Sequence, residues 1–287
     1  MRAYLEFACR LGELAGGVIL PHFRLALEVD NKAAPGHDPL TTANQTGAIV
    51  TEMAPGYGAA SAYDPVTVAD RSAEEAIVAE IARVYPEHAI YGEEHGRKAG
   101  SAGLTWVIDP IDGTRAFILG QLHWGTLIAL NDGARPMLGV MHQPYVGETF
   151  VGSPSGAFLR RGGREDRLRT RPCSNLREAR VCTSHPDQFA RREERAAFDL
   201  IASKARLTRY GGDCYNYCLL AAGLIDLVIE SQLFAYDVQA LIPMIEAAGG
   251  VMTGWDGQPC YQGGAVIAAG DPRLHRSVLE MLAWTVT

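Results

Sequence analysis

The residues of this chain best suited to chemistry are two aspartates in the segment WVIDPIDGTRAF, where an apolar stretch ends. Pro110 lies between Asp109 and Asp112, and its fixed φ helps to stop a strand and to turn both carboxylates, with the carbonyl of Ile111, toward one point. Ligand sets made only of oxygen suit hard cations such as Mg²⁺ or Mn²⁺, whereas zinc prefers histidine and cysteine. The structural alternative is that Asp109 caps a turn and Asp112 begins an Asp-Gly turn.

Three further features favour a functional site over a structural turn. Glu93 and Glu94 end another apolar segment, AIYGEEHG, where adjacent carboxylates repel each other unless a cation relieves the repulsion. Asp237 precedes a helical pattern; it is either a helix cap or, given its apolar flanks, a residue at the bottom of a cleft. Gly113 and Thr114 offer backbone N–H groups and a hydroxyl where a helix would begin, which favours an anion. Carboxylates for a metal beside amides for an anion indicate a phosphate ester as substrate.

The hydrophobic pattern predicts the elements that position these residues. Helical spacing runs from residue 4 to about 23, with few breakers apart from a Gly16–Gly17 pair, and again from residue 71 to 85. Strands separated by Gly, Asn-Asp and Pro turns follow up to about residue 152. We therefore expect residues 1–152 to form an α+β domain that carries most of the metal ligands on a mostly antiparallel sheet.

The pattern changes after residue 152. Strands and helices alternate, and a last helix opens at Asp271 and Pro272. This alternation predicts a layered α/β domain over residues 153–287, which carries the substrate-contacting residues and the last metal ligand.

Composition limits the class of protein. The chain has 287 residues, 47% of them hydrophobic, and a formal charge of −7, which argues against a nucleic-acid binder and leaves room for an acidic site that needs cations. No apolar run approaches membrane-spanning length, and the charged start MRAYLEFACR does not resemble a signal peptide. The six cysteines form no C-x-x-C pair, so we expect free thiols in a reducing, cytoplasmic setting.

Four segments together resemble the lithium-sensitive inositol monophosphatase superfamily of Mg²⁺-dependent phosphatases. They are DPVTVADRSAEEAI, YGEEHG, WVIDPIDGTRAF and YDVQALIPMIEAAGG, which occur in the family's order and span most of the chain. The resemblance implies a five-layered α-β-α-β-α sandwich of α/β class, usually dimeric, with the site between the two halves. It also implies Mg²⁺ as cofactor, with Mn²⁺ as an alternative, and inhibition by lithium.

The same resemblance implies a role for each site residue. The metal ligands would be Glu93, Asp109, the carbonyl of Ile111, Asp112 and Asp237, with Asp109 bridging two ions. Asp70 and Thr114 would orient and help deprotonate a metal-bound water, which agrees with the chemistry that paired cations support in phosphoryl transfer. The structural alternatives are that Asp70 only caps the following helix and that Thr114 is only a turn hydroxyl.

Within the superfamily, two features look like the histidinol-phosphate phosphatase branch of histidine biosynthesis. DGT continues with RAF where inositol phosphatases usually have TNF, and Asp213 stands where those enzymes tend to have a small apolar residue. An added carboxylate would favour the ammonium and imidazole of histidinol phosphate over a polyol. The substrate and phosphate contacts would be Gly113, Thr114, Arg115, Gly211, Asp213 and Glu230. The alternatives are an inositol monophosphatase, a broad phosphomonoesterase, or a regulator without turnover, although no catalytic residue of the family is missing.

One segment departs from the family pattern. HDPLTTANQ at 37–45 is echoed by YDPVTVADR at 63–71, and only the second copy ends in the needed carboxylate, because Asn44 replaces the equivalent of Asp70. The segment between the copies is rich in Gly, Ala and Pro. We therefore predict an inserted loop over residues 36–62 near the mouth of the cleft.

Overall fold

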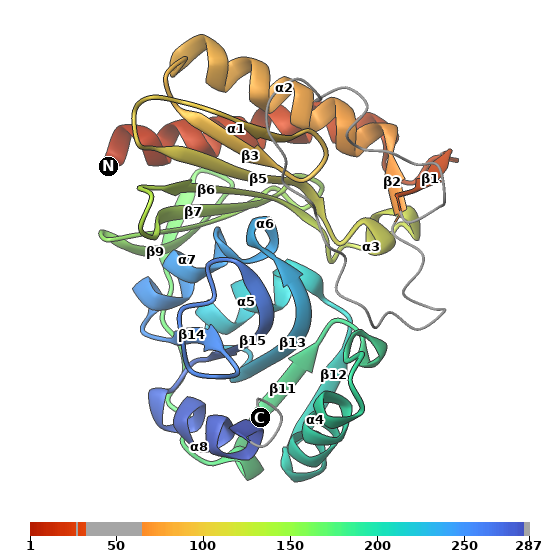
Figure 1. Ribbon diagram of the computed structural model, residues 1–287, viewed down its shortest axis with the longest axis vertical. Helices are drawn as coiled ribbons and strands as arrows, with labels where there is room; N and C mark the ends of the chain where they lie inside the picture. The colour runs from red at the N-terminus through yellow and green to blue at the C-terminus, as the bar shows by residue number, and fades with distance from the viewer. Residues whose placement is uncertain (27, 33–64, 284–287) are drawn as a thin grey trace.

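The computed structural model describes residues 1–26, 28–32 and 65–283. The predicted insertion at 36–62 lies outside the described residues. Helices and two large sheets alternate in five layers (Figure 1). This is the predicted α-β-α-β-α arrangement.

The outer layer on one side consists of two long helices, α1 (Arg2–Ile19) and α2 (Val68–Val84), which pack on each other and on the first sheet. A 3-10 turn (Leu20–His22) extends α1. A short hairpin precedes α2 and consists of β1 (Val29–Asn31) and β2 (Pro65–Thr67). Helix α2 begins three residues before the predicted start at residue 71, because Thr67 caps it: its hydroxyl accepts a hydrogen bond from the backbone N–H of Ala69.

The first sheet has eight strands, antiparallel except for the β3–β5 pair. In spatial order they are β10 (Arg164–Arg167), β9 (Gly156–Arg161), β8 (Glu148–Ser153), β7 (Pro136–Gln143), β6 (Gly125–Asn131), β5 (Thr105–Asp112), β3 (Ala89–Gly92) and β4 (Gly96–Lys98). A short helix, α3 (Thr114–Ile118), follows β5. The first sheet therefore continues to Arg167, past the domain boundary expected near residue 152.

Three helices fill the layer between the sheets: α5 (Asp213–Ala221), α6 (Ala235–Val238) and α7 (Leu241–Ala248). Two glycines on paired strands, Gly139 and Gly152, allow this layer to approach the first sheet closely. A Cβ on Gly139 would lie 1.8 Å from the carbonyl oxygen of Ala240, and one on Gly152 would lie 2.2 Å from Cα of Met244. Backbone of the middle layer thus rests directly on β7 and β8.

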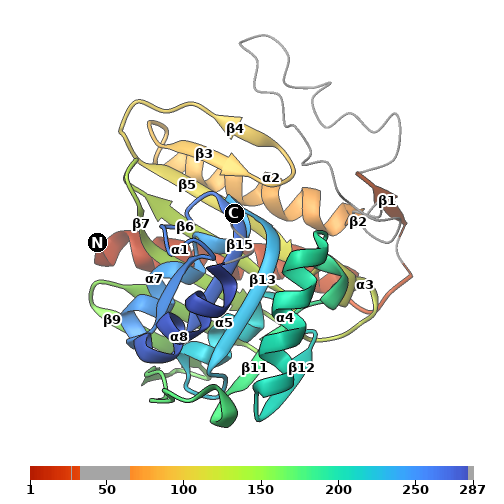
Figure 2. The ribbon, with the colours of Figure 1, turned by 60° about the horizontal axis from the view of Figure 1, so that its bottom comes forward.

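The second sheet has five strands, in the order β12 (Leu207–Tyr210), β11 (Arg180–Thr183), β13 (Leu227–Phe234), β15 (Gly263–Ala269) and β14 (Val251–Gly254). Helices α4 (Arg192–Lys204) and α8 (Pro272–Leu282) cover its outer face (Figure 2). Asp271 caps α8 and Pro272 is its first residue, as predicted. Strand β14 is not predicted by the sequence pattern, because its four residues directly follow the glycines that end α7.

Buried apolar side chains form three clusters: one between α1, α2 and the first sheet, one around α5 to α7, and one beneath α4 and α8. All six cysteines are buried and unpaired, and they are distributed over the three clusters. None of the helices in the described part of the chain is both long and apolar enough to cross a membrane.

Candidate active site

A break in the pairing of β5 with β6 brings Asp109 and Asp112 to the same place. Asp109 pairs with Leu127 and Asp112 with Gly125, so one strand has more residues than the other between these pairs. The carbonyl of Pro110, inside the break, accepts a hydrogen bond of 2.9 Å from the Thr126 hydroxyl. The proline does not end the strand, because β5 continues to Asp112; the pairing with β6 instead shifts its register between the two carboxylates.

The third aspartate comes from the other side of the cleft. Asp237 lies in α6, where its Oδ2 accepts the backbone N–H of Phe234 at 2.7 Å. Ligand oxygens of Asp109, Asp112 and Asp237 all lie within 4.8 Å of one another. The structure therefore brings together carboxylates from opposite halves of the chain.

The electrostatics of this cluster fit a cation. Oδ1 of Asp109 is buried and has no hydrogen-bond partner among the described residues, although buried polar atoms normally have one. Burial, then the charges of Glu93, Asp112 and Asp237, raises the pKa of Asp109 well above its usual range. Burial likewise raises the pKa of Asp237, with Asp112 the next cause, and raises that of Asp112 to about 6. A bound divalent cation would satisfy the free oxygen and relieve the repulsion.

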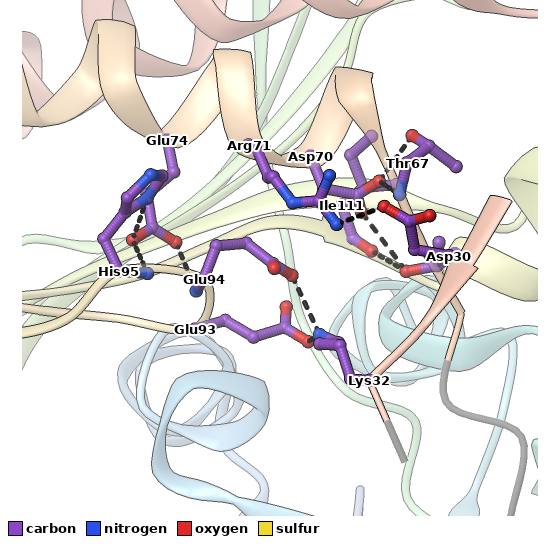
Figure 3. A network of polar contacts seen from close by, with 11 residues as sticks. Asp30, Lys32, Thr67, Asp70, Arg71, Glu74, Glu93, Glu94, His95 and Ile111 are labelled. Carbon is purple, nitrogen blue, oxygen red and sulfur yellow. Dashed lines mark hydrogen bonds and ion pairs between the residues drawn. The ribbon is translucent and has the colours of Figure 1, made fainter. Parts of the chain in front are cut away.

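Glu93 and Glu94 lie outside the group of three aspartates and contact a partner that sequence reasoning missed (Figure 3). Nζ of Lys32 is 2.7 Å from Oε1 of Glu93 and 2.8 Å from Oε1 of Glu94. The ammonium group thus stands between the two carboxylates whose repulsion was expected to need a metal ion. Burial and the charge of Glu93 still raise the pKa of Glu94 to about 8.

Asp70 and Thr114 meet beside the cluster, as predicted, but with different first partners. Oδ2 of Asp70 accepts the backbone N–H of Thr67 at 2.8 Å and its hydroxyl at 2.6 Å. The Thr114 hydroxyl is 3.4 Å from Oδ1 of Asp70 and 3.0 Å from the carbonyl oxygen of Ile111. Thr67 is therefore the helix cap, and Asp70 is the third residue of the helix. Burial raises the pKa of Asp70 to about 6 despite the hydrogen bonds from Thr67.

The cleft continues from the group of three aspartates, between α5 and β13. Four of its lining residues are carboxylates: Asp112, Asp213, Glu230 and Asp237. The other lining residues are Ser184, Gln188, Cys214, Tyr217, Leu233 and Leu241. Among them, sequence reasoning missed the polar Ser184, Gln188 and Tyr217, which stand in segments without a recognisable chemical pattern.

Four hydrogen bonds connect the cleft residues to the group of three aspartates and to each other. The backbone N–H of Cys214, in the first turn of α5, donates to Oδ2 of Asp112 at 2.7 Å. Glu230 accepts hydrogen bonds from the backbone N–H of Ser184 at 2.8 Å, from the Ser184 hydroxyl, and from the Tyr217 hydroxyl at 2.8 Å. Burial nonetheless raises the pKa of Glu230 to about 7.

Asp213 has an unusual backbone conformation. Its φ is +43°, and it follows Gly211 and Gly212, whose φ values are also positive. Positive φ is uncommon for residues other than glycine and, where it occurs, often marks a functional site. Burial and the charges of Asp112 and Glu230 raise the pKa of Asp213 well above its usual range, whereas the nearby Arg115 opposes the shift. Asp213 is thus held in the cleft, while the exposed Arg115 lies near it in the first turn of α3.

Comparison with known proteins shows the family of the chain. The family model for the inositol monophosphatase family matches residues 1–285. The chain is 43% identical to the bifunctional phosphatase IMPL2 of Arabidopsis thaliana, in a match that covers 77% of this chain and 66%, less than two thirds, of that protein. It is 34% identical to the histidinol-phosphatase of Mycobacterium tuberculosis, over 76% of this chain and 84% of that one. An inositol monophosphatase structure from Zymomonas mobilis superposes with a TM-score of 0.78, at 38% identity and 98% coverage of both chains.

Proposed function

The chain belongs to the inositol monophosphatase family and is a phosphoric monoester hydrolase, and from this premise we propose that it hydrolyses L-histidinol phosphate to L-histidinol and phosphate. The observation that carries the proposal is the pair of carboxylates, Asp213 and Glu230, that line the cleft beyond the metal cluster. The identity to a histidinol-phosphatase supports the same substrate.

In this proposal, Mg²⁺ would be held by Glu93, Asp109, the Ile111 carbonyl, Asp112 and Asp237. Mn²⁺ would be able to replace Mg²⁺, and lithium would inhibit the enzyme. Bound cations neutralise the phosphate oxygens and lower the pKa of water, so that a nucleophile is available at neutral pH. The unpartnered Oδ1 of Asp109 and the raised pKa values of the cluster support this assignment. We also propose that the protein is a homodimer and is located in the cytoplasm.

Asp70 and Thr114 would orient the attacking water. The Thr114 hydroxyl has a single proton, so it donates either to the Ile111 carbonyl or to Oδ1 of Asp70. When it donates to Asp70, its lone pairs are free to accept a hydrogen bond from the attacking water, and taking a proton from that water would require the hydroxyl to pass its own proton to Asp70. Thr67 occupies the other oxygen of Asp70 through two hydrogen bonds and so keeps Oδ1 directed toward Thr114.

The far end of the cleft would bind the cationic part of the substrate. Histidinol phosphate carries an ammonium group and an imidazole, and Asp213 and Glu230 are acceptors for either. Because burial raises the pKa of both carboxylates, a cation bound there would relieve an unfavourable arrangement of charge. A polyol offers no such charge, so it would gain less from Asp213.

The alternative is an inositol monophosphatase or a broad-specificity phosphatase, which the likeness to the Zymomonas mobilis structure supports. A panel of substrates distinguishes these proposed activities. The value of kcat/KM is measured with Mg²⁺ for histidinol phosphate, inositol 1-phosphate, fructose 1,6-bisphosphate and p-nitrophenyl phosphate. We expect histidinol phosphate to be preferred by about 10²-fold or more, the scale of discrimination that a matched polar pocket supplies. Similar values for all four substrates would favour the broad phosphatase.

Asp213→Asn tests the residue that sets the preference. Asparagine tolerates positive φ and has nearly the same size, so the exchange removes the charge without disturbing the start of α5. Loss of a hydrogen bond to a charged group is typically worth about 1–3 kcal/mol, so KM for histidinol phosphate should rise about 10- to 100-fold. Inositol 1-phosphate is the control, and its KM should stay unchanged; an equal effect on both substrates would show that Asp213 has a structural role.

A further inference from the structure

Glu74 is a fully buried carboxylate that the proposed chemistry does not use. It lies on α2 one turn after Asp70, and its side chain points to the turn between β3 and β4 (Figure 3). Oε2 accepts the backbone N–H of Glu94 at 2.9 Å, and Oε1 accepts the backbone N–H of His95 at 2.8 Å. Oε1 is also 3.1 Å from Nδ1 of His95. One side chain thus takes up both N–H groups that follow Glu93.

The other side of the same carboxylate is in contact with Gly92. A Cβ on Gly92 would lie 2.0 Å from Oε1 of Glu74, so no larger residue fits there unless the carboxylate moves. Glu93 therefore follows Gly92, whose position has no room for a side chain, and precedes Glu94 and His95, whose backbone N–H groups are hydrogen-bonded to Glu74. Its own N–H donates to the Ile108 carbonyl of β5 at 3.1 Å. The backbone on both sides of Glu93 is fixed.

We propose that Glu74 is a positioning residue for Glu93, aiming its carboxylate at the cation held by the neighbouring aspartates. The inference rests on the proposed role of Glu93 as a metal ligand and adds a residue that acts through it. Partners of metal ligands commonly contribute about 10- to 100-fold to metal affinity. Asp70 and Glu74, one turn apart on α2, would make this helix the common support of the water-orienting pair and of one metal ligand.

Both oxygens of Glu74 are needed, which makes glutamine an informative replacement. The amide of Glu74→Gln would keep one acceptor and place an N–H₂ group against a backbone N–H, so one of the two bonds to the turn is lost with almost no change in volume. Glu75, the next residue, is exposed, and its Oε1 lies 3.6 Å from Nε2 of His95. Glu75→Gln therefore removes the same charge beside the same histidine and leaves the turn intact, as a matched control.

Calorimetric titration of the metal-stripped full chain with Mg²⁺ measures the effect without relying on turnover. We expect Glu74→Gln to weaken Mg²⁺ binding about 10-fold or more, the range given by partners of metal ligands, while Glu75→Gln binds like the wild type. The Mg²⁺ concentration for half-maximal turnover should rise in parallel, with kcat largely recovered at saturating Mg²⁺. A lowered melting temperature with unchanged Mg²⁺ affinity would overturn the inference, because Glu74 would then only hold the hairpin.

Gly92→Ala gives an independent route to the same displacement and decides the matter if Glu74→Gln does not fold. Its methyl group would push the Glu74 carboxylate away from the turn, so Mg²⁺ affinity should fall in the same direction. Unchanged affinity in Gly92→Ala would count against the inference. A wild-type chain that bound no Mg²⁺ would overturn the metal assignment and with it this inference, whereas wild-type binding with unaffected variants would overturn the inference alone.

Discussion

At the scale of single residues, the site is a cluster of carboxylates that the fold makes costly to ionise. Burial is the largest cause of the raised pKa of Asp109, Asp213 and Asp237, and the charges of neighbouring carboxylates follow. Lys32 offsets part of this repulsion at the rim, between Glu93 and Glu94. In the metal-free protein, ionising these buried carboxylates therefore costs free energy, and a bound cation can offset this cost.

The raised pKa values of the buried carboxylates predict how stability depends on pH. Glu230, with a pKa of about 7, and Glu94, with one of about 8, stay partly protonated in the folded chain where their unfolded counterparts are ionised. Since the folded state then binds more protons, its free energy of unfolding falls as pH rises from about 6.5 to about 8. Buried His142, whose lowered pKa is about 4, acts in the opposite direction from that pH up to the unfolded pKa near 6.5, so its contribution fades across the lower part of this window. Scanning calorimetry in EDTA should show the fall, and Mg²⁺ should restore most stability at the alkaline end.

Asp109→Asn is the matching variant for this prediction. It removes one carboxyl group with a raised pKa and one metal ligand without a change in size. The stability of the metal-free variant should therefore fall less steeply with pH, and Mg²⁺ should stabilise the variant less than the wild type. It should also lose Mg²⁺-dependent phosphate release. A metal-free wild type whose melting temperature is flat or rises between about pH 6.5 and 8 would contradict the electrostatic description.

Sequence reasoning found the aspartates of the site because they stand in a compact pattern. DPIDGT places Asp109 and Asp112 beside a proline, which alone is weak evidence for a metal site, and the resemblance to the inositol monophosphatase superfamily makes them and Asp237 candidate ligands. Lys32, Ser184 and Tyr217 could not be found in this way, because their partners Glu93 and Glu230 lie far along the chain and are brought to them only by tertiary structure. Glu74 carried a weak signal, its spacing of one helical turn from Asp70.

At the scale of elements, α1 contains two adjacent glycines with different surroundings. Gly16 is buried against β7 and the turn that follows it: a Cβ there would lie 2.7 Å from Cβ of Pro144 and 3.2 Å from Nε2 of His142. Gly17 is exposed, and a Cβ there would meet nothing within 4 Å. Only Gly16 is therefore required by packing.

The pair gives a prediction with its own control. Gly17→Ala should stabilise the protein by about 0.5–1 kcal/mol, because glycine is that much worse than alanine inside a helix. Gly16→Ala should destabilise it by about 1–3 kcal/mol through overpacking against β7. Urea unfolding of the two variants measures both changes. Two stabilised variants would show that α1 can move away from the sheet at little cost.

Elements with strong periodicity could be predicted, and those on the sheet edges could not. Asp271 and Pro272 begin α8 because capping chemistry is local. The Arg-rich segment from 160 to 172 is predicted as a turn region with a solvated hairpin face, and β9 and β10 form a hairpin there. The bounds of its strands could not be predicted, because an edge strand needs no buried face and shows no apolar alternation. The change from the first sheet to the second is hidden for the same reason.

At the scale of the whole molecule, the site depends on the spacing between layers. Asp109 and Asp112 belong to the first sheet, whereas Asp237 belongs to the middle helices. Gly139 sets the distance between these layers, because its missing side chain leaves room for the carbonyl of Ala240, which follows Asp237 closely in the chain. A change in that spacing would move one ligand relative to the other two.

Gly139→Ala tests this dependence at a position remote from the reacting groups. The added methyl group would force α6 and α7 away from β7, so the Mg²⁺ concentration for half-maximal turnover should rise along with a loss of about 1–3 kcal/mol in stability. Val140→Ala is the control. Val140 is the next residue of β7 and packs in the cluster on the α1 side, so its truncation creates a cavity there and does not push on the middle helices. Equal Mg²⁺ requirements in the two variants would show that the layers repack without moving Asp237.

The buried cysteines give each of the three apolar clusters its own chemical reporter. Cys9 lies in the cluster beneath α1, Cys173 in the cluster beneath α4 and α8, and the remaining four lie around the middle helices. Burial raises the pKa of Cys9 to about 11 and that of Cys260 to about 12, so the native thiols carry little of the reactive thiolate form. Alkylation at neutral pH then proceeds through opened states, and the order in which these positions become modified gives the order in which the layers separate.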